Sequence, residues 1–253
     1  MSQLERTALI LDIDGVIRDV SGSYRRALAD TVENFTSFRP SPLDIDNLKA
    51  EGRWNNDWEA SQELIRRYFQ QHGDEQETQI LPKSEQVIAF FQSRYRGTGI
   101  PWDGYITQEP LLADPQFFGE LSTAGINWGF FSGATRASAE YVLRRLGIQH
   151  SVLVAMEDAP SKPNPEGLFL AIAQFAKPIT TVIYAGDTVA DMLAVVQARK
   201  QDPSKKYLAV GVIPPHVEEG RRSAYQENLI KNGADLVCLN VMDLRPQAIA
   251  DII

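Results

Sequence analysis

The sequence has few of the side chains that form disulfides or soft-metal sites. It holds one cysteine, Cys238, and three histidines among its 253 residues. A single cysteine cannot form an internal disulfide, and it excludes zinc and iron–sulfur sites that need several thiolates. A histidine-rich metal centre is not expected with so few imidazoles. Disulfide-stabilised proteins and multi-cysteine metalloproteins are therefore excluded.

Long hydrophobic runs are also absent. The longest uninterrupted apolar runs, such as Val87–Phe91, are far shorter than the roughly 20 residues that a membrane-spanning helix needs. The segment Met1–Leu11 carries one basic residue and only Ala8–Leu11 as an apolar run, so we expect no signal peptide. These patterns predict a cytoplasmic protein with no membrane partner.

Basic charge is in the minority. The chain has 25 Lys and Arg against 33 Asp and Glu, a formal charge of −8, and its basic pairs are scattered along the sequence. An acidic chain without a basic cluster is a poor ligand for phosphate backbones, so we expect no nucleic-acid partner. Hydrophobic residues make up 43% of the chain, which excludes a disordered protein. No feature of the sequence indicates an oligomeric state.

Short apolar runs recur along the chain, and each stops at polar, glycine or proline residues. Helical patterns such as Ala137–Leu146 and Val189–Lys200 separate them. Strands that alternate with helices of this length predict βαβ units and a doubly wound parallel sheet, an α/β fold. The expected strands are Thr7–Leu11, Ile126–Phe131, Ser151–Met156, Thr181–Ala185 and Tyr207–Ile213, with Ala234–Leu239 as a candidate sixth.

The alternation is interrupted after the first strand. Residues 22–105 contain no run that is typical of a buried strand, and they are rich in charge, Gln and Asn. We therefore predict a helical domain at 22–105, inserted into an α/β core formed by 1–21 and 106–253. Its expected helices are Tyr24–Phe35, Pro42–Lys49, Glu59–Gln71 and Ser84–Tyr95.

Two aspartates follow the first strand directly. Asp12 and Asp14 are separated by one residue, so both carboxylates can face one cavity at the carboxyl end of the strand. Like charges this close resist joint ionisation unless a cation lies between them or one of them holds a proton. Both arrangements serve phosphoryl transfer at an aspartate. A solvated turn is the alternative reading of this short motif.

A second acidic pair follows the strand Thr181–Ala185. Asp187 and Asp191 are spaced i and i+4, which predicts that they are neighbours on one helix face. The structural alternative is a helix N-cap. Together with Asp12 and Asp14, the pair forms an oxygen-only ligand set of the kind that Mg²⁺ takes.

A cation and a hydroxyl complete the set of candidate residues. Lys162 lies in a loop stiffened by proline and supplies a positive charge for a phosphate, although an isolated lysine is more often a surface residue. Ser132 and Gly133 follow the apolar strand Ile126–Phe131, where a hydroxyl and backbone N–H groups can hold phosphoryl oxygens. A serine that caps the next helix is the alternative for Ser132.

The inserted domain has one unusual stretch, Glu51–Trp58. It offers a cation, two amides and two indoles, which are groups that recognise the leaving part of a substrate. The alternative is that the indoles pack the domain's own small core. The candidate specificity residues are Arg53, Trp54, Asn55, Asn56 and Trp58.

Taken in order, these motifs resemble the haloacid dehalogenase-like (HAD) superfamily of hydrolases, in particular the phosphoglycolate-phosphatase-like subgroup with a helical cap after the first strand. The resemblance covers the whole chain. Asp12-Ile13-Asp14-Gly15-Val16 is similar to the first motif of the family, Ser132 to the second, Lys162 to the third, and Gly186-Asp187 with Asp191 to the fourth.

The resemblance implies a role for each acidic residue. Asp12 would be the nucleophile that forms an aspartyl-phosphate, and Asp14 would protonate the leaving oxygen and then activate water. Mg²⁺ would be held by the Asp12 carboxylate, the main-chain carbonyl of Asp14 and Asp187. Asp191 would position Lys162 or a metal-bound water.

The remaining implied roles concern the phosphoryl group. Ser132 and Lys162 would bind its oxygens. Asp14 favours phosphate substrates, because members that cleave carbon–halogen bonds lack an acid there. Ser132-Gly133-Ala134 replaces the Asn that often follows the second-motif residue in this subgroup, so the identity of the substrate does not transfer.

The sequence therefore predicts a Mg²⁺-dependent phosphatase for a small phosphate ester. A phosphomutase of the same subgroup and a non-catalytic relative that binds a phosphorylated ligand are the alternatives. A non-catalytic protein would not need the acid and base that Asp14 supplies.

Overall fold

The computed structural model describes residues 2–51, 54, 56–72 and 81–253. The candidate residues Arg53 and Asn55 lie outside this range. Contacts between residues divide the chain into two compact units, one formed by Met1–Asp19 with Leu111–Ile253 and the other by Val20–Pro110.

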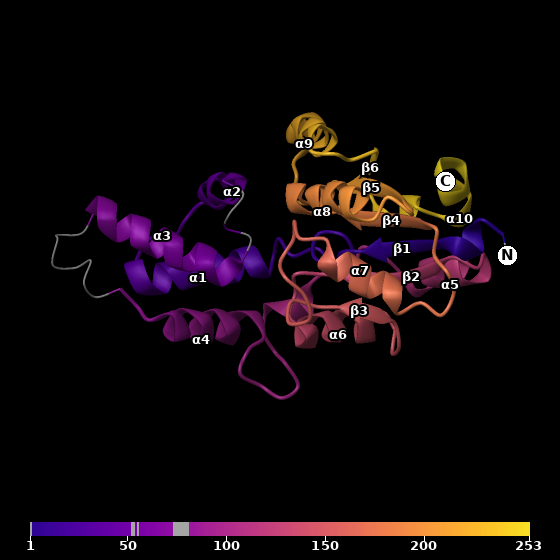
Figure 1. Cartoon of the computed structure of the whole chain (residues 1–253). Helices are drawn as coiled ribbons and strands as arrows, with labels where there is room; N and C mark the ends of the chain where they lie inside the picture. The colour runs from indigo at the N-terminus through magenta and orange to yellow at the C-terminus, as the bar shows by residue number, and fades with distance from the viewer. Residues whose placement is uncertain (1, 52–53, 55, 73–80) are drawn as a thin grey trace. The chain divides into compact units, whose positions relative to one another are not determined.

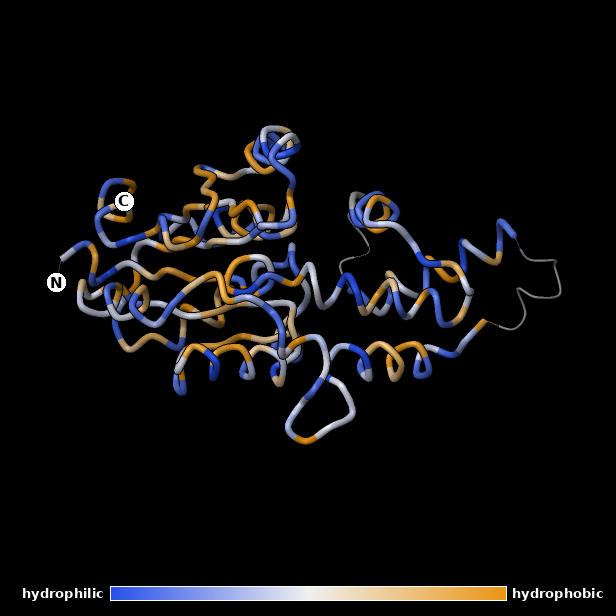
Figure 2. The backbone as a smooth tube through the Cα atoms, turned by 180° about the vertical axis from the view of Figure 1, so that it is seen from behind, coloured by the Kyte–Doolittle hydropathy of each residue, from blue (hydrophilic) through white to orange (hydrophobic). Residues whose placement is uncertain are grey.

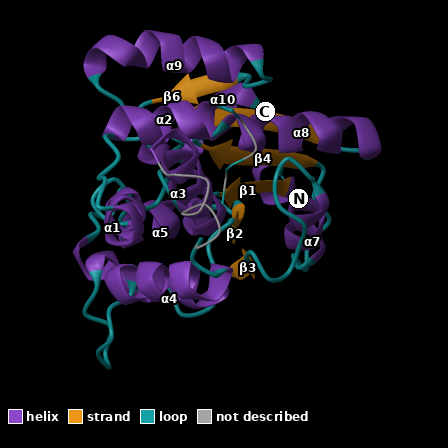
Figure 3. Ribbon diagram, turned by 90° about the vertical axis from the view of Figure 1, so that its left-hand side faces the viewer, coloured by secondary structure: helices purple, strands orange, loops and turns teal. Residues whose placement is uncertain are grey.

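The first unit is built on a six-stranded, all-parallel sheet in the order β3-β2-β1-β4-β5-β6. Figure 3 shows the strands side by side, with helices on either side. This confirms the predicted α/β fold. Its strands are β1 (Thr7–Leu11), β2 (Asn127–Phe131), β3 (Val152–Val154), β4 (Thr181–Gly186), β5 (Lys206–Val212) and β6 (Leu236–Cys238).

Helices cover both faces of this sheet (Figure 1). Leu9 and Leu11 point into a hydrophobic core shared with α5, α6 and α10, whereas Ala8 and Ile10 point into a core shared with α7, α8 and α9. Because both faces are covered, all five residues of β1 are buried. Figure 2 shows orange, hydrophobic stretches of chain inside this unit. The helices are α5 (Pro115–Thr123), α6 (Arg136–Arg145), α7 (Glu166–Ala173), α8 (Val189–Gln201), α9 (Glu219–Lys231) and α10 (Pro246–Ile252).

The two edge strands are shorter than the sequence predicts. β3 and β6 each have three residues, whereas the apolar runs around them have six. Each edge strand pairs with one neighbour only, and only three residues of each run form the strand. Short 3-10 turns complete the unit at η1 (Leu4–Arg6) and η4 (Val241–Asp243).

The topology places the carboxyl ends of β1, β2 and β4 next to one another. β1 pairs with β2 on one side and with β4 on the other, with Leu11 opposite Phe130 and Ala185. The chain thus places β2 and β3 on one side of β1 and then crosses to place β4, β5 and β6 on the other. Open α/β sheets bind ligands at such a switch point, and we call this carboxyl edge of β1, β2 and β4 the crevice. The candidate aspartates follow β1 and β4 at this edge.

The second unit consists of helices in the part of the chain that the structure describes. α1 contacts both α3 and α4, and its core includes Leu28, Phe91 and Tyr95. The Tyr24 ring stacks on Tyr95 with centroids 4.1 Å apart. The elements are α1 (Tyr24–Thr36), α2 (Pro42–Ala50), α3 (Asp57–His72), α4 (Ser84–Tyr95) and the 3-10 turn η3 (Tyr105–Gln108).

Candidate active site

Asp12 is the first residue after β1, and the sheet holds it in place. Its backbone N–H donates to the Ala185 carbonyl over 2.9 Å, which extends the β1–β4 ladder by one step. Its carboxylate is 5% exposed, and Oδ1 accepts from the N–H of Ile13 over 2.7 Å. Asp12 therefore lies inside the crevice, which excludes the alternative of a solvated turn for this residue.

Lys162 reaches the same crevice from the loop before α7. Its ammonium group donates to Asp12 Oδ2 over 2.8 Å and to Asp191 Oδ1 over 2.5 Å. The Lys162 side chain is only 10% exposed, so the alternative of a surface lysine is excluded. One buried cation thus bridges the carboxylates that follow β1 and β4.

Asp191 uses its two oxygens for two different tasks. Oδ2 accepts from the backbone N–H of Thr188 and from its hydroxyl, which forms a capping box at the start of α8. Oδ1 accepts from Lys162. Asp191 therefore caps α8 through Oδ2 and binds Lys162 through Oδ1, so the predicted helix cap and the predicted contact with the cation are both present.

The prediction that Asp187 and Asp191 share a helix face is wrong. Thr188 is the N-cap of α8 in an extended conformation, so Asp187 precedes the helix. The two carboxylates still converge, because the chain turns sharply after β4. A ligand oxygen from each of Asp12, Asp187 and Asp191 lies within 4.8 Å of the others.

Two glycines allow this close approach. Gly15 has φ +74°, and a Cβ on it would lie 2.2 Å from Asp187 Oδ2. A Cβ on Gly186 would lie 2.3 Å from the Asp191 carboxyl carbon. Any other residue at either position would push a carboxylate out of the crevice.

Burial and repulsion between like charges control the pKa values of the three carboxylates. Burial raises the pKa of Asp12 to about 6 against the opposing effect of Lys162, and the charge of Asp191 adds to the rise. Burial, Asp191 and Asp12 raise the pKa of Asp187 well above its usual range. The pKa of Asp191 is lowered in spite of its burial, because Lys162 and Thr188 bind its ionised form.

The crevice fits a divalent cation by charge and by donor type. Three buried carboxylates face one ammonium group, which leaves two negative charges uncompensated when all are ionised. Among the described residues, none donates a hydrogen bond to the carboxylate of Asp187, although that residue is only 9% exposed. Oxygen ligands with some negative charge are what Mg²⁺ takes.

Ser132 follows β2 at the same edge of the sheet. It is 1% exposed, its N–H donates to the Val154 carbonyl, and its hydroxyl oxygen accepts from the N–H of Ala134 over 3.2 Å. The N-cap of α6 is Thr135, so Ser132 does not cap that helix. Gly133 next to it is exposed, and a Cβ there would meet nothing within 4 Å.

Tyr184 is a component of the site that sequence reasoning missed. Its buried hydroxyl accepts from Lys162 over 3.0 Å and lies 3.0 Å from both the Phe131 carbonyl and Asp191 Oδ1. It therefore connects the ends of β2 and β4 to the cation. The signal was a tyrosine in an otherwise apolar buried strand, because a buried phenol needs a hydrogen-bond partner.

Tyr225 was missed as well. From α9 its hydroxyl donates to the main-chain carbonyl of Asp187 over 2.7 Å, which fixes the turn that carries this carboxylate. No local pattern marks Tyr225 in the sequence, because α9 has a mostly exposed, charged face around it.

Asp14 lies at this edge without joining the three carboxylates. Its side chain is 29% exposed and forms an ion pair with the fully buried Arg18, with Nη2 2.6 Å from Oδ1. Asp14 is thus close enough to raise the pKa of Asp12 by its charge, although its own carboxylate contacts a different cation.

The candidate specificity residues that the structure describes form hydrogen bonds within the helical unit. Asn56 Oδ1 accepts from the backbone N–H of Trp58 over 2.9 Å at the start of α3, and Trp54 Nε1 donates to Glu51 over 2.9 Å. Trp54 also lines a hollow of about 370 Å³ beside α3. The indoles of Trp54 and Trp58 are partly buried, so neither is sealed in the unit's core.

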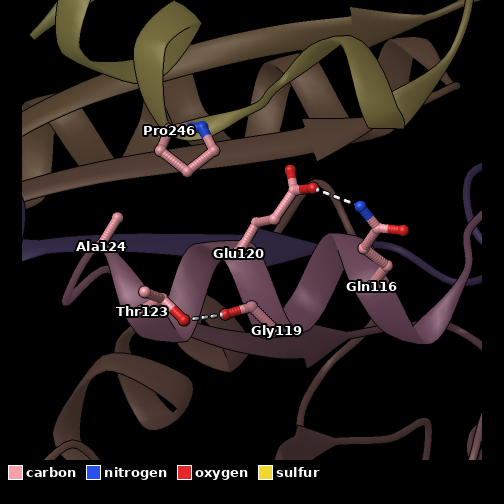
Figure 4. Close-up of a pocket in the computed structure, with 6 residues that line it drawn as sticks. All are labelled: Gln116, Gly119, Glu120, Thr123, Ala124 and Pro246. Carbon is pink, nitrogen blue, oxygen red and sulfur yellow. Dashed lines mark hydrogen bonds between the residues drawn. The ribbon is translucent and has the colours of Figure 1, made fainter.

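Another hollow, of about 520 Å³, lies between α5 and the start of α10 (Figure 4). Its polar side chains form hydrogen bonds within α5: Gln116 donates to the Glu120 carboxylate over 2.8 Å, and Thr123 donates to the main-chain carbonyl of Gly119. None of the candidate residues within the described ranges lines it. It therefore offers no converging polar groups for catalysis.

The family assignment follows from comparison with known proteins. The family model of the haloacid dehalogenase-like hydrolases matches residues 7–199. The matched range includes Lys162 and the carboxylates of Asp12, Asp187 and Asp191. The chain belongs to the haloacid dehalogenase-like hydrolases. This confirms the predicted family and an enzyme of the hydrolase class.

Individual relatives differ in how much of their length they share with this hydrolase. It is 32% identical over 190 residues to the imidazoleglycerol-phosphate dehydratase of Phytophthora nicotianae. That match covers 74% of this chain and 40% of the dehydratase. It is 22% identical to the N-acetylmuramic acid 6-phosphate phosphatase of Pseudomonas aeruginosa, over 99% of this chain and all of that protein. The hydrolase therefore spans less than half of the first relative.

Among solved structures, the fold is similar to that of the phosphatase Tt82 from Thermococcus thioreducens. The TM-score is 0.66 at 20% identity, and the match covers 87% of this chain and 99% of the other. In this hydrolase, no described helix has both the length and the hydrophobicity to cross a membrane. The cytoplasmic location expected from the sequence stays a prediction.

Proposed function

We propose that this hydrolase is a Mg²⁺-dependent phosphatase that cleaves a small phosphate monoester through a phosphoryl group carried on Asp12. The observation that carries the proposal is the contact of the Lys162 ammonium with both Asp12 and Asp191, inside a crevice lined by a third carboxylate. A nucleophilic carboxylate, a phosphate-binding cation and an oxygen-ligand set then lie within one hydrogen-bonded group. The name of the full-length Pseudomonas relative also supports a phosphatase.

Asp12 has the properties of the nucleophile. With a pKa of about 6 it is mostly ionised at neutral pH, and its backbone is held by the sheet. A carboxylate oxygen of Asp12 attacks phosphorus, and the bond from phosphorus to the ester oxygen breaks. Asp14 gives a proton to that oxygen. Asp14 then takes a proton from the water that attacks the phosphoryl group, which leaves as inorganic phosphate and restores Asp12.

Lys162 and Ser132 bind the phosphoryl oxygens in this proposal. Lys162 is charged and buried, so its interaction with a phosphate is weakly screened. The hydroxyl hydrogen of Ser132 is available to a phosphoryl oxygen, because its oxygen acts as the acceptor toward Ala134. Gly133 is exposed at the same edge.

Asp12, Asp187 and the main-chain carbonyl of Asp14 would hold the Mg²⁺ ion, which supplies charge neutralisation at the transferring phosphoryl group. Asp191 stays outside this ligand set, because its oxygens already bind Lys162 and Thr188. Its part is to hold Lys162 in place.

The helical unit at 20–110 supplies the cap in this proposal. The residues described above bind only the phosphoryl group, so recognition of the leaving group needs another part of the chain. Arg53, Trp54, Asn55, Asn56 and Trp58 remain the candidates for that role.

The direct test is a phosphate-release screen with Mg²⁺ over a panel of metabolite phosphates. The panel includes imidazoleglycerol phosphate and N-acetylmuramic acid 6-phosphate, which the names of the relatives provide. Asp12→Asn is the matched control, because an amide of the same shape cannot act as nucleophile. Loss of the nucleophilic carboxylate costs several powers of ten in rate. The proposal fails when no ester releases phosphate above the Asp12→Asn background while circular dichroism shows both proteins folded.

The same screen separates a phosphatase from a phosphomutase. A phosphatase releases one phosphate for each ester consumed. A mutase consumes a sugar phosphate and returns an isomer, with phosphate release far below ester consumption. Mass balance by phosphorus NMR decides between the two.

A further inference from the structure

Arg18 is a buried cation that neither the carboxylate cluster nor the phosphate-binding groups use. It is 0% exposed and is among the largest fully buried side chains that the structure describes. Two of its guanidinium nitrogens, Nε and Nη2, each lie 2.6 Å from Oδ1 of Asp14. An arginine is costly to bury, so its location beside the Asp14 carboxylate needs a reason.

The main chain of Arg18 braces the same turn. Its carbonyl accepts from the N–H of Gly15 over 2.9 Å, and its N–H donates to the Ile13 carbonyl over 3.1 Å. A β-bridge joins Arg18 to Asp14, and another joins it to Leu111. Arg18 therefore holds the backbone and the side chain of the Asp14 turn at once.

The two oxygens of Asp14 are used unequally. Both guanidinium contacts reach Oδ1, whereas Oδ2 accepts no hydrogen bond from any residue in the described ranges. A contact made only for stability would gain from a bidentate pair that uses both oxygens. Here the carboxylate is fixed through one oxygen while the other stays open to a reacting group.

We propose that Arg18 is the positioning residue for Asp14, fixing Oδ1 so that Oδ2 faces the ester oxygen of the substrate. This inference rests on the proposed phosphatase function. In the first step Asp14 Oδ2 gives its proton to the ester oxygen while the bond from phosphorus to that oxygen breaks and the bond to Asp12 forms. In the second step Oδ2 takes a proton from the attacking water while the bond from phosphorus to Asp12 breaks.

The test uses the leaving-group dependence of kcat/KM, which reports the first step. An alkyl phosphate needs its leaving oxygen protonated, whereas 4-nitrophenyl phosphate releases a stable anion and needs little help from an acid. In Arg18→Gln we expect kcat/KM for the best alkyl phosphate of the screen to fall about 100-fold and that for 4-nitrophenyl phosphate less than about 10-fold. A role in folding alone would lower both equally.

Four further variants sharpen the result. Asp14→Asn should show the same selective loss, and Arg18→Gln combined with Asp14→Asn should lose no more than Asp14→Asn alone, because the two residues act as one unit. Arg18→Lys keeps the charge but not the fork of donors, and it should lie between wild type and Arg18→Gln. Arg245→Gln removes an exposed arginine that pairs with Glu120, outside the site, and should change neither substrate.

Equal losses on the two substrates in Arg18→Gln overturn the inference, and so do additive losses in the double variant. If Arg18→Gln does not fold, the same ratio in Arg18→Lys decides, and an unchanged ratio there overturns it. A wild-type protein inactive on every ester contradicts the proposed function instead, and the inference falls with it.

Discussion

The Tyr184 hydroxyl lies 3.0 Å from the Lys162 ammonium and 3.0 Å from the main-chain carbonyl of Phe131. It connects the loop that carries the cation to the ends of two strands. Burial raises the pKa of Tyr184 well above its usual value, so the hydroxyl keeps its proton and remains a donor. The position of Lys162 beside Asp12 therefore depends on a residue outside the group of carboxylates.

Replacing Tyr184 by Phe is expected to weaken phosphate binding. The ring still fills the core, but Lys162 loses one partner and the Phe131 carbonyl loses a donor. One hydrogen bond is worth about 1 kcal/mol, so we expect inorganic phosphate to inhibit the variant about 5- to 10-fold more weakly. Tyr207→Phe is the matched control, because the Tyr207 hydroxyl contacts Asp202 outside the site. Equal inhibition constants in wild type and Tyr184→Phe would contradict the role.

Stability should fall with rising pH in EDTA because of Asp12. Its folded pKa of about 6 lies above the unfolded value of about 3.9, so the unfolded chain loses its proton first. The contribution of Asp12 to stability is therefore complete below about pH 4, is lost as the pH rises through 6, and changes no further above that. Asp187, whose pKa is also raised, acts in the same direction.

The measurement is urea unfolding at pH 4.5 and pH 7.5 in wild type and Asp12→Asn. Because other groups also titrate, the difference between the two proteins is the quantity of interest. We expect Asp12→Asn to gain stability relative to wild type at the higher pH. If the difference in stability between the two proteins does not change with pH, the pKa of Asp12 is not raised in the folded protein.

Activity should require Mg²⁺, and Ca²⁺ should replace it poorly. The carboxylates of Asp12 and Asp187 with one carbonyl make a sparse oxygen set that suits an octahedral ion with retained waters. Ca²⁺ takes six to eight ligands and would engage both Asp12 oxygens, which leaves none to attack. Full activity after exhaustive dialysis against EDTA would contradict this prediction.

Thermal unfolding tests the Mg²⁺ site without measuring turnover. Mg²⁺ should raise the melting temperature of wild type, because it binds the folded protein and relieves the repulsion among the carboxylates. Asp187→Asn should show a smaller rise. A stabilisation that survives this change would place the ion elsewhere.

Substrate choice should depend on the segment Arg53–Trp58. We expect Arg53→Ala and Trp58→Ala to raise KM for the best metabolite ester far more than for 4-nitrophenyl phosphate, which has few groups for the cap to bind. Asn56 caps α3, so Asn56→Asp is the better variant there: it preserves the cap and adds a charge that repels an anionic ester. Equal effects on both substrates in all three variants would assign the segment to packing alone.

The sequence determined the fold class because local patterns suffice for it. The run Thr7–Leu11 has no polar side chain except Thr7 and stops at Asp12, and it forms a strand with the same bounds. Ser84–Tyr95 became a helix with the predicted bounds. A buried parallel strand and an amphipathic helix each carry their signal in their own residues, so neighbours far away in the chain were not needed.

The candidate carboxylates were also visible in the sequence, because they stand at strand ends. Where each one lies was decided by tertiary structure. Thr188 took the N-cap of α8 and left Asp187 outside the helix, and Asp191 divided its two oxygens between that cap and Lys162. These outcomes depend on competition between partners, which spacing alone does not express.

Only the folded chain revealed Arg18 and Tyr184. Arg18 lies only four positions from Asp14, but its full burial arises from the fold, whereas Tyr184 contacts groups far away in the sequence. Tyr184 reaches Phe131, 53 positions away, because β1 lies between β2 and β4 in the sheet. Local periodicity sets which residues are buried, but the order of the strands decides which buried polar groups meet, and that order arises from packing of the whole sheet.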